Sequence, residues 1–172
     1  HYYQNPEVQE LADYVGDSYY LSEIGKNSEA QIIVYCGVQF MAESAKVLSP
    51  DKTVILPAPN AGCPMADMAE VEDVEEMIKK YPDAFKVCYI NSSYEVKALC
   101  DASVTSSSAL NIMNNIPNKQ ILFLPDQNLG GYIAEFFPEK EFILWRGFCP
   151  THHRITAEDV LNAKQEHPNG KY

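Results

Sequence analysis

The sequence repeats itself with a period of 86 to 89 residues, and this feature limits the possible folds more than any other. The matching stretches are 7–13 with 95–101, 49–56 with 137–144, 31–33 with 120–122, and 71–83 with 157–169. The first two matches have an offset of 88, the third needs one inserted residue, and the last has an offset of 86. A repeat of this length predicts that one supersecondary unit occurs more than once in the chain.

Each copy alternates short apolar runs with amphipathic stretches. We expect strands at 32–35, 53–56, 85–90, 102–104, 120–124 and 141–145. We expect helices at 6–14, 18–25, 40–48, 70–81, 94–100, 105–115, 128–136 and from 156 onward. The expected strands are continuously apolar, which is typical of parallel strands covered on both faces. The pattern predicts an α/β fold of tandem, pseudo-symmetric three-layer αβα units with short parallel sheets.

The repeat also predicts the domain organisation. We expect a first α/β unit at 1–62, a second at 63–148, and the start of a third at 149–172. The sequence stops where the first strand of the third unit should begin. Three such units would be arranged around a pseudo-threefold axis.

The charge balance argues against several classes of partner. The chain has 24 acidic and 13 basic residues and a formal charge of −11, whereas nucleic acids and anionic membranes attract basic surfaces. No apolar run approaches the roughly 18–20 residues that span a bilayer, and no signal peptide is visible. The five cysteines are an odd number without a short CxxC spacing. This cysteine usage favours a reducing, cytoplasmic location.

Two of the five cysteines stand apart from the others. Cys63 and Cys149 lie in loops that contain Gly and Pro and are 86 residues apart, whereas Cys36, Cys88 and Cys100 lie within or beside apolar segments. Equivalent cysteines of successive units would converge near the axis, and a third is expected beyond residue 172. Three thiolates select zinc, copper(I) or an iron–sulfur cluster. A [4Fe–4S] cluster held by three cysteines keeps one iron free to act as a Lewis acid on a substrate hydroxyl or carboxylate.

Other polar residues fall at strand ends or helix starts, where ligands bind in parallel α/β sheets. The repeat pairs His1 with Tyr89, Tyr3 with Asn91, and Ser18 with Ser106. The two serines could bind a phosphate or carboxylate at a helix N-terminus, or they could be ordinary helix caps. The histidine and the tyrosines could move protons. His152 follows Cys149 closely and could help to orient a ligand, or it could simply be exposed.

Eight stretches of the sequence together resemble the quinolinate synthases, iron–sulfur enzymes of NAD biosynthesis. The stretches are 1–4, 16–18, 36–43, 49–52, 62–68, 89–91, 105–107 and 147–152. The resemblance implies three similar α/β domains around a pseudo-threefold axis. It also implies the reaction, in which iminoaspartate condenses with dihydroxyacetone phosphate to give quinolinate with loss of phosphate and two waters. An aspartate-oxidising enzyme would supply the iminoaspartate.

The resemblance also implies roles for single residues. Cys63 and Cys149 would be two of the three ligands of a [4Fe–4S] cluster. The catalytic residues would be Tyr3, His1 and Tyr89, and the substrate would contact His1, Ser18, Tyr89, Ile90, Asn91 and Ser106. The third cysteine, a His-Pro-Glu-Cys stretch and a Gly-Ser-Thr loop of the family are absent from the sequence. We therefore expect these 172 residues alone to be inactive and to hold no cluster.

Two other classes of function remain open from the residues alone. One is a binding protein that holds a phosphate or dicarboxylate in an inter-domain cleft without catalysis. The other is a protein with a structural zinc site. A visible cluster absorbance would distinguish the enzyme from both.

Overall fold

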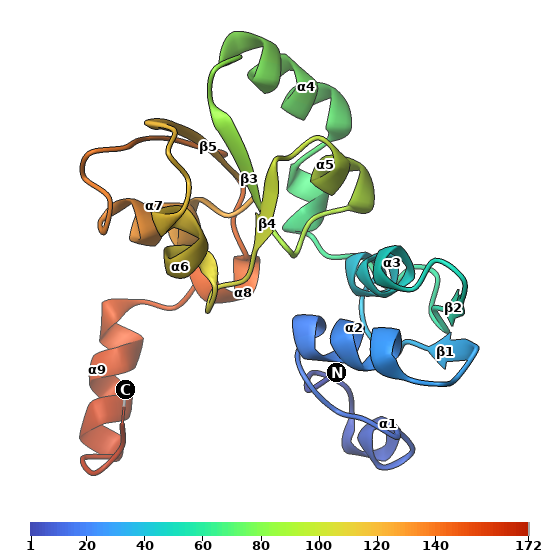
Figure 1. Ribbon diagram of the computed structural model, residues 1–172. Helices are drawn as coiled ribbons and strands as arrows, with labels where there is room; N and C mark the ends of the chain where they lie inside the picture. Colours follow the sequence, from blue (N-terminus) through green and yellow to red (C-terminus); the bar gives the residue numbers. More distant parts are fainter. Residues whose placement is uncertain (172) are drawn as a thin grey trace.

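The computed structural model describes residues 1–171, and its strands form two parallel sheets (Figure 1). The first sheet pairs β1 (Ile32–Val34) with β2 (Thr53–Ile55). The second sheet has the order β4-β3-β5-β6, with strands β3 (Phe85–Tyr89), β4 (Ala102–Val104), β5 (Gln120–Leu124) and β6 (Glu141–Leu144). Every strand pair in the two sheets is parallel. The predicted α/β fold with short parallel sheets is confirmed.

Helices alternate with these strands along the chain. They are α1 (Pro6–Glu10), α2 (Ser18–Asn27), α3 (Gln39–Leu48), η1 (Ala66–Met68), α4 (Val71–Lys80), α5 (Tyr94–Ala98), α6 (Ala109–Asn114), α7 (Gln127–Ala134), α8 (Pro150–His153) and α9 (Ala157–Glu166). The largest deviations from the expected bounds are at α1, which ends at Glu10 and not at 14, and at α6, which begins at Ala109 and not at 105. The preceding residues form a turn, because the backbone N–H groups of Thr105 and Ser108 each donate to the other's hydroxyl.

The second sheet is the middle layer of a three-layer sandwich. On one face, Val87, Ile121 and Phe123 pack with Met113 of α6 and Ile133 of α7, all fully buried or nearly so. On the other face, Cys88, Leu122 and Leu124 pack with Val74 of α4 and Val96 of α5. Side chains of one strand point to alternate faces. The continuously apolar sequence of β5 is therefore explained by burial on both faces.

The two sheets repeat the same strand register at an offset of 88 residues. Ile32 pairs with Thr53 in the first sheet, and Gln120 pairs with Glu141 in the second, so both partners shift by 88. The backbone N–H of Thr53 donates to the Gln31 carbonyl at 2.9 Å, and that of Glu141 donates to the Lys119 carbonyl at 2.7 Å. The one-residue insertion that we expected near residue 31 is therefore wrong, because the register keeps the offset of 88 through β1.

A lysine at the start of the last strand has the same role in both sheets. The ammonium of Lys52 donates to the carbonyls of Gly25 and Ser28, the first at 2.7 Å. The ammonium of Lys140 donates to the carbonyls of Ile116 at 2.6 Å and Asn118 at 2.9 Å. Each lysine thus connects the C-terminal end of a helix, or the residues just after it, to the beginning of the edge strand.

Replacing Lys140 with methionine should destabilise the second sheet. The substitution leaves two carbonyls without their charged donor. A hydrogen bond to a charged group contributes about 1.5–3 kcal/mol to stability, and less where the group is partly exposed to water. We expect the free energy of unfolding in urea to fall by about 1–3 kcal/mol. The exposed Lys79 of α4 offers a matched control, for which Lys79→Met should change stability by less than about 0.5 kcal/mol. Equal losses in the two variants would contradict the role of Lys140.

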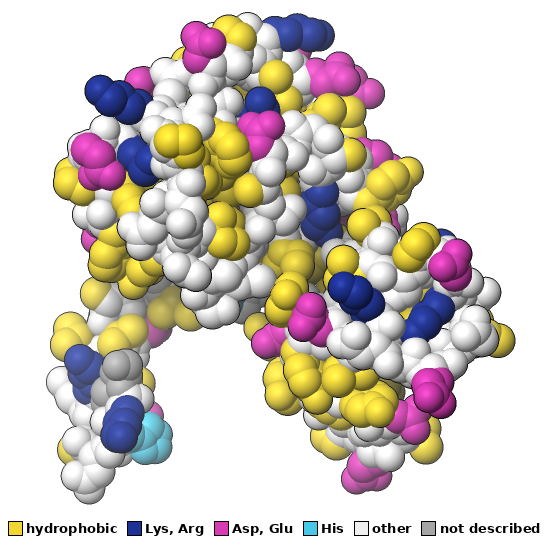
Figure 2. Space-filling model, viewed as in Figure 1, with side chains coloured by type: hydrophobic (Ala, Val, Ile, Leu, Met, Phe, Trp, Pro, Cys, Tyr) yellow, Lys and Arg dark blue, Asp and Glu magenta, His cyan; other side chains and the backbone are white. Residues whose placement is uncertain are grey.

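Helix α9 extends away from both sheets (Figure 1), and Figure 2 shows the surface hollowed between α9 and the lobe that carries α1 and α2. None of its side chains is buried in the described structure. Its counterpart is α4, whose Val74 has no exposed area, whereas Val160 at the equivalent position is 38% exposed. The two sheets lie within the predicted units 1–62 and 63–148, and the unit boundaries themselves stay predictions.

None of the helices described within residues 1–171 has both the length and the apolar character needed to cross a membrane.

Candidate functional site

Cys63 and Cys149 occupy equivalent positions in the backbone. The N–H of Asp67 donates to the carbonyl of Cys63 at 3.0 Å, and the N–H of His153 donates to the carbonyl of Cys149 at 2.9 Å. Each cysteine therefore begins one helical turn, followed by η1 in the first case and formed by α8 in the second. A proline directly follows each cysteine and occupies the first position of the turn. Proline is favoured there, because the backbone N–H that it lacks would have no acceptor within the helix. The structural equivalence that the 86-residue spacing predicts is confirmed for the backbone.

The loops that carry the two cysteines touch each other through Met68. The indole N–H of Trp145 donates to the Met68 carbonyl at 2.8 Å, and the N–H of Phe148 lies 3.5 Å from the Met68 sulfur. The segment that follows Cys63 is thus fixed to the segment that precedes Cys149. Both thiols are free and partly exposed.

The two thiols have different surroundings. Cys63 packs beside Phe40 and lines a cavity of about 60 Å³ together with Glu43, Asp67 and Ser93. Cys149 lies at the N-terminus of α8. Within residues 1–171, no three His, Cys, Asp or Glu side chains come together in a group that could hold a metal ion.

Tyr89 brings several of the predicted residues together at the carboxyl end of β3. Burial raises the pKa of its phenol above the usual 10.0, and nearby negative charge from Asp126, Tyr3 and Cys149 raises it further. The side chain of Ser106 acts in the opposite direction and lowers the pKa of Tyr89. Tyr3, Ser106 and Cys149 come from segments far apart in the sequence, and all three influence the pKa of this one phenol. At neutral pH this phenol keeps its proton.

Sequence reasoning missed Asp126, which is 5% exposed. Its carboxylate accepts hydrogen bonds from the N–H groups of Asn128 at 2.8 Å and Leu129 at 3.3 Å and thereby caps α7. The signal that could have found it is an aspartate placed just after an apolar strand and before a helix, which is a preferred N-cap. Because its negative charge also raises the pKa of Tyr89, Asp126 belongs to the candidate site.

The N-terminal candidates lie close to one another. The rings of His1 and Tyr3 are 4.7 Å apart in an edge-on arrangement, and the N–H of Tyr3 donates to Nδ1 of His1 at 3.2 Å. The Tyr3 side chain is 85% exposed. A phenol beside an imidazole can exchange protons with it when a substrate bridges the two groups.

The two serines are not equivalent in the structure. Ser18 is the first residue of α2, and its carbonyl accepts from the Ser22 hydroxyl at 2.9 Å and the Tyr35 hydroxyl at 3.3 Å. The cap of α2 is Asp17, whose carboxylate accepts from the N–H of Tyr20 at 2.8 Å. The expectation that Ser106 also opens a helix is wrong, because Ser106 lies in the turn before α6.

The remaining candidates continue from β3 or lie near Cys149. The N–H of Ile90 donates to the Val104 carbonyl at 2.8 Å, which extends the pairing of β3 with β4, and Asn91 follows at the partly exposed end. His152 is exposed. Its neighbour His153 has the closer contacts, with its ring 4.4 Å from that of Phe148 and its Nδ1 3.3 Å from the Asn128 amide.

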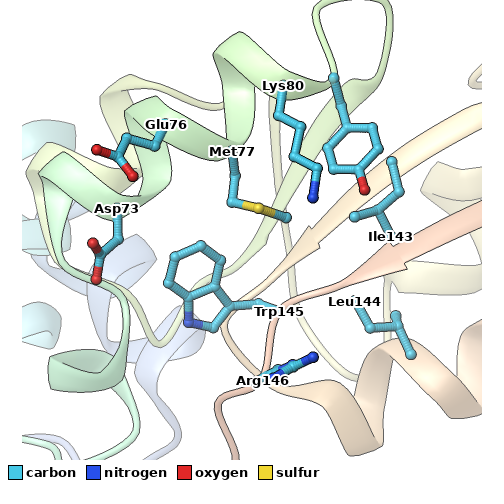
Figure 3. A pocket seen from close by; sticks show the side chains of 9 residues that line it. Asp73, Glu76, Met77, Lys80, Ile143, Leu144, Trp145 and Arg146 are labelled. Atoms are coloured by element: carbon cyan, nitrogen blue, oxygen red, sulfur yellow. The ribbon is translucent and has the colours of Figure 1, made fainter.

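A larger cavity of about 640 Å³ lies beside the edge strand β6 (Figure 3). Asp73, Glu76 and Lys80 of α4 line one side, and Trp145 and Arg146 line the other. None of the residues predicted from the sequence lines this cavity. The cavity therefore gives no support to a catalytic site at this place.

Comparisons with known proteins agree with the resemblance seen in the sequence. A family model described as "Quinolinate synthetase A protein" matches residues 1–172. A quinolinate synthase of Clostridioides difficile (strain 630) is 58% identical over 171 residues, covering 99% of this chain and 56% of that protein. One of Clostridium perfringens (strain 13 / Type A) is 62% identical over 167 residues, covering 97% and 56%.

A third relative is similar to about the same degree. A quinolinate synthase of Caldicellulosiruptor bescii is 57% identical over 169 residues, covering 98% of this chain and 56% of that protein. The chain thus spans a little over half the length of these curated relatives. A family match over the whole chain, together with identities well above 30%, establishes its membership. This chain belongs to the quinolinate synthetase A protein family.

Proposed function

We propose that the protein of natural length that contains this chain is a quinolinate synthase, which condenses iminoaspartate with dihydroxyacetone phosphate in the cytoplasm. Family membership supports the proposal. The structural observation that carries it is the pair of equivalent backbone turns that begin at Cys63 and Cys149, whose loops are joined through Met68. An aspartate-oxidising enzyme would supply the iminoaspartate, which is an unstable compound.

The thiols of Cys63 and Cys149 fit two of the three positions of a [4Fe–4S] cluster. Both are free, partly exposed and held by equivalent backbone turns, and thiolates are the usual ligands of such clusters. The third ligand would come from outside these 172 residues. When bound, the cluster would supply an iron that accepts an oxygen of the substrate.

We assign the remaining steps to residues of this chain. The Tyr89 phenol would donate a proton to a substrate oxygen, since its raised pKa keeps it protonated at neutral pH. Tyr3 and His1 would also move protons, because their rings are in contact. The hydroxyls of Ser106 and Ser18 and the amide of Asn91 would bind the phosphate and carboxylate groups.

We further propose that a third α/β unit packs against α9. By the repeat, α9 corresponds to α4, which buries Val74 completely against the second sheet. The exposed apolar side chains of α9, Val160 and Leu161, would then be covered in the same way. That unit would fill the hollow visible in Figure 2.

The proposed function is tested by incubating the natural-length protein with iron and sulfide without oxygen and then supplying both substrates. We expect a brown protein that forms quinolinate, whereas the 172-residue chain alone should do neither. A colourless natural-length protein that binds a dicarboxylate without turnover would instead favour a binding protein. A colourless protein that contains zinc would favour a structural zinc site.

Replacing Tyr89 with phenylalanine should slow the reaction without weakening substrate binding much. The substitution removes the proposed proton donor but keeps the ring, and general acid catalysis contributes about 10²–10⁴-fold. We expect kcat to fall by at least about 100-fold, with little change in KM. Steady-state kinetics measure this, and Tyr132→Phe on the exposed side of α7 is the matched control. An unchanged kcat in the Tyr89→Phe variant would exclude this role.

A further inference from the structure

Few polar contacts join the first predicted unit, 1–62, to the second, 63–148. In the part of the chain that the structure describes, every hydrogen bond between these two ranges has Glu43 of α3 or Lys97 of α5 as one partner. The two helices lie side by side where the two lobes meet in Figure 1. The contact between α3 and α5 is therefore the polar connection between the units.

Glu43 supplies an acceptor to the beginning of α5. One oxygen of its carboxylate accepts from the backbone N–H of Tyr94, the first residue of α5, at 3.0 Å. The other oxygen accepts from the side-chain amide of Gln39, one turn earlier in α3, at 2.8 Å. N–H groups in the first turn of a helix have no acceptor within that helix. The carboxylate is thus held by its own helix and satisfies a donor of the neighbouring unit.

Lys97 makes the second connection, one turn further along α5. Its ammonium donates to the Ser44 hydroxyl at 2.7 Å and to the Phe40 carbonyl at 3.4 Å, and it lies 5.5 Å from the centroid of the Phe40 ring. Burial lowers the pKa of Lys97 to about 8, so the amine is still charged at pH 7. Residues three apart lie on the same face of a helix, so Tyr94 and Lys97 hold one face of α5 against α3.

This contact joins the two groups of residues that we assign to the substrates. His1 and Ser18 belong to the first unit, whereas Tyr89 and Asn91 belong to the second. Helix α5 begins three residues after Asn91. A misplacement of about 1 Å, caused far from the reacting atoms, can slow an enzyme about 100-fold. The position of α5 on α3 therefore decides whether one substrate can reach both groups.

We propose that Glu43 and Lys97 are positioning residues, which fix the first unit relative to the second and thereby hold the two groups of substrate-binding residues at the separation that the reaction needs. Neither residue contacts a substrate in this role. The inference rests on the proposed function, because the residues that it positions are those assigned to the quinolinate synthase reaction.

Hydrogen exchange of the Tyr94 amide tests the contact itself in the natural-length protein, without any reaction. Glu43→Ala removes the acceptor, whereas Glu43→Gln keeps an oxygen that can accept the same hydrogen bond. We expect the Tyr94 amide to exchange about 10-fold faster in Glu43→Ala and at nearly the original rate in Glu43→Gln, while the amides of β3 are unchanged. An unchanged exchange rate in Glu43→Ala would overturn the proposal.

Steady-state kinetics of the same protein, reconstituted without oxygen, test the effect on the substrates. We expect KM for at least one substrate to rise by about 10-fold or more in Glu43→Ala and in Lys97→Met, and to stay near the original value in Glu43→Gln. Glu75→Ala on the exposed side of α4 is the matched control and should leave KM unchanged. A merely structural role would reduce the amount of folded enzyme and lower kcat alone, so a lower kcat with an unchanged KM would contradict positioning.

The two measurements also separate this inference from the proposed function. If the unsubstituted protein forms no quinolinate, the proposed function fails, and the exchange of the Tyr94 amide alone decides whether Glu43 fixes one unit to the other. If the unsubstituted protein forms quinolinate and KM is unchanged in both Glu43→Ala and Lys97→Met, the proposed function stands and the positioning role is overturned.

Discussion

Replacing Cys149 with serine in the natural-length protein is expected to abolish quinolinate formation. A serine hydroxyl is a hard and weakly acidic donor, and it is a poor substitute for a thiolate on iron. Loss of a group that only supports a metal ligand already costs about 10–100-fold. Loss of the ligand itself should cost more, so we expect activity to fall by more than about 100-fold. The measurement is the rate of quinolinate formation after reconstitution without oxygen.

Cys100→Ser is the matched control for Cys149→Ser. It removes a cysteine of similar partial exposure that the proposal does not assign to the cluster. Under reducing conditions we expect this variant to keep its visible absorbance and its activity. If Cys149→Ser retained full activity, the assignment of Cys149 as a ligand would be wrong.

Replacing Gly147 with alanine should lower both the stability of the protein and its iron binding. A Cβ at Gly147 would lie 2.5 Å from the backbone carbonyl oxygen of Pro125, and a backbone atom cannot move aside as a side chain can. The Gly147 carbonyl also accepts from the N–H of Gln127 at 2.8 Å. Overpacking of this kind costs about 1–3 kcal/mol. Because Cys149 follows two residues later, we expect lower stability and weaker iron binding together.

A second glycine provides the control for this substitution. A Cβ at Gly131, within helix α7, would meet only the Leu144 side chain at 3.9 Å, an ordinary contact. Alanine favours a helix over glycine by about 0.5–1 kcal/mol. Gly131→Ala should therefore leave the free energy of unfolding unchanged or raise it slightly. Urea denaturation gives the free energy of unfolding of both variants. Equal values for Gly147→Ala and Gly131→Ala would contradict the close packing at Gly147.

The arrangement of helices and strands could be predicted because two independent signals agree. The repeat fixes which segments correspond, and the continuously apolar strands indicate burial on both faces. The shared register of β1–β2 and β5–β6 follows from the same repeat. The equivalence of Cys63 and Cys149 was predictable for the same reason, because each begins a turn at the same place in its unit.

The details that failed depend on contacts that a sequence does not display. Ser106 was placed at a helix start, but the mutual hydrogen bonds of Thr105 and Ser108 form a turn there instead. The role of Asp126 depends on its proximity to Tyr89, which comes from the neighbouring strand of the sheet. Local pattern identifies an N-cap but does not say which distant side chain the carboxylate influences.

The central claim is that Cys63 and Cys149 bind one and the same cluster. The most direct measurement is the iron bound per protein after reconstitution without oxygen, in the natural-length protein, in Cys63→Ser, in Cys149→Ser and in the double variant. A shared cluster predicts that either single substitution removes as much iron as both together. Partial losses that add up in the double variant would show that the two thiols serve separate sites, and would contradict the account.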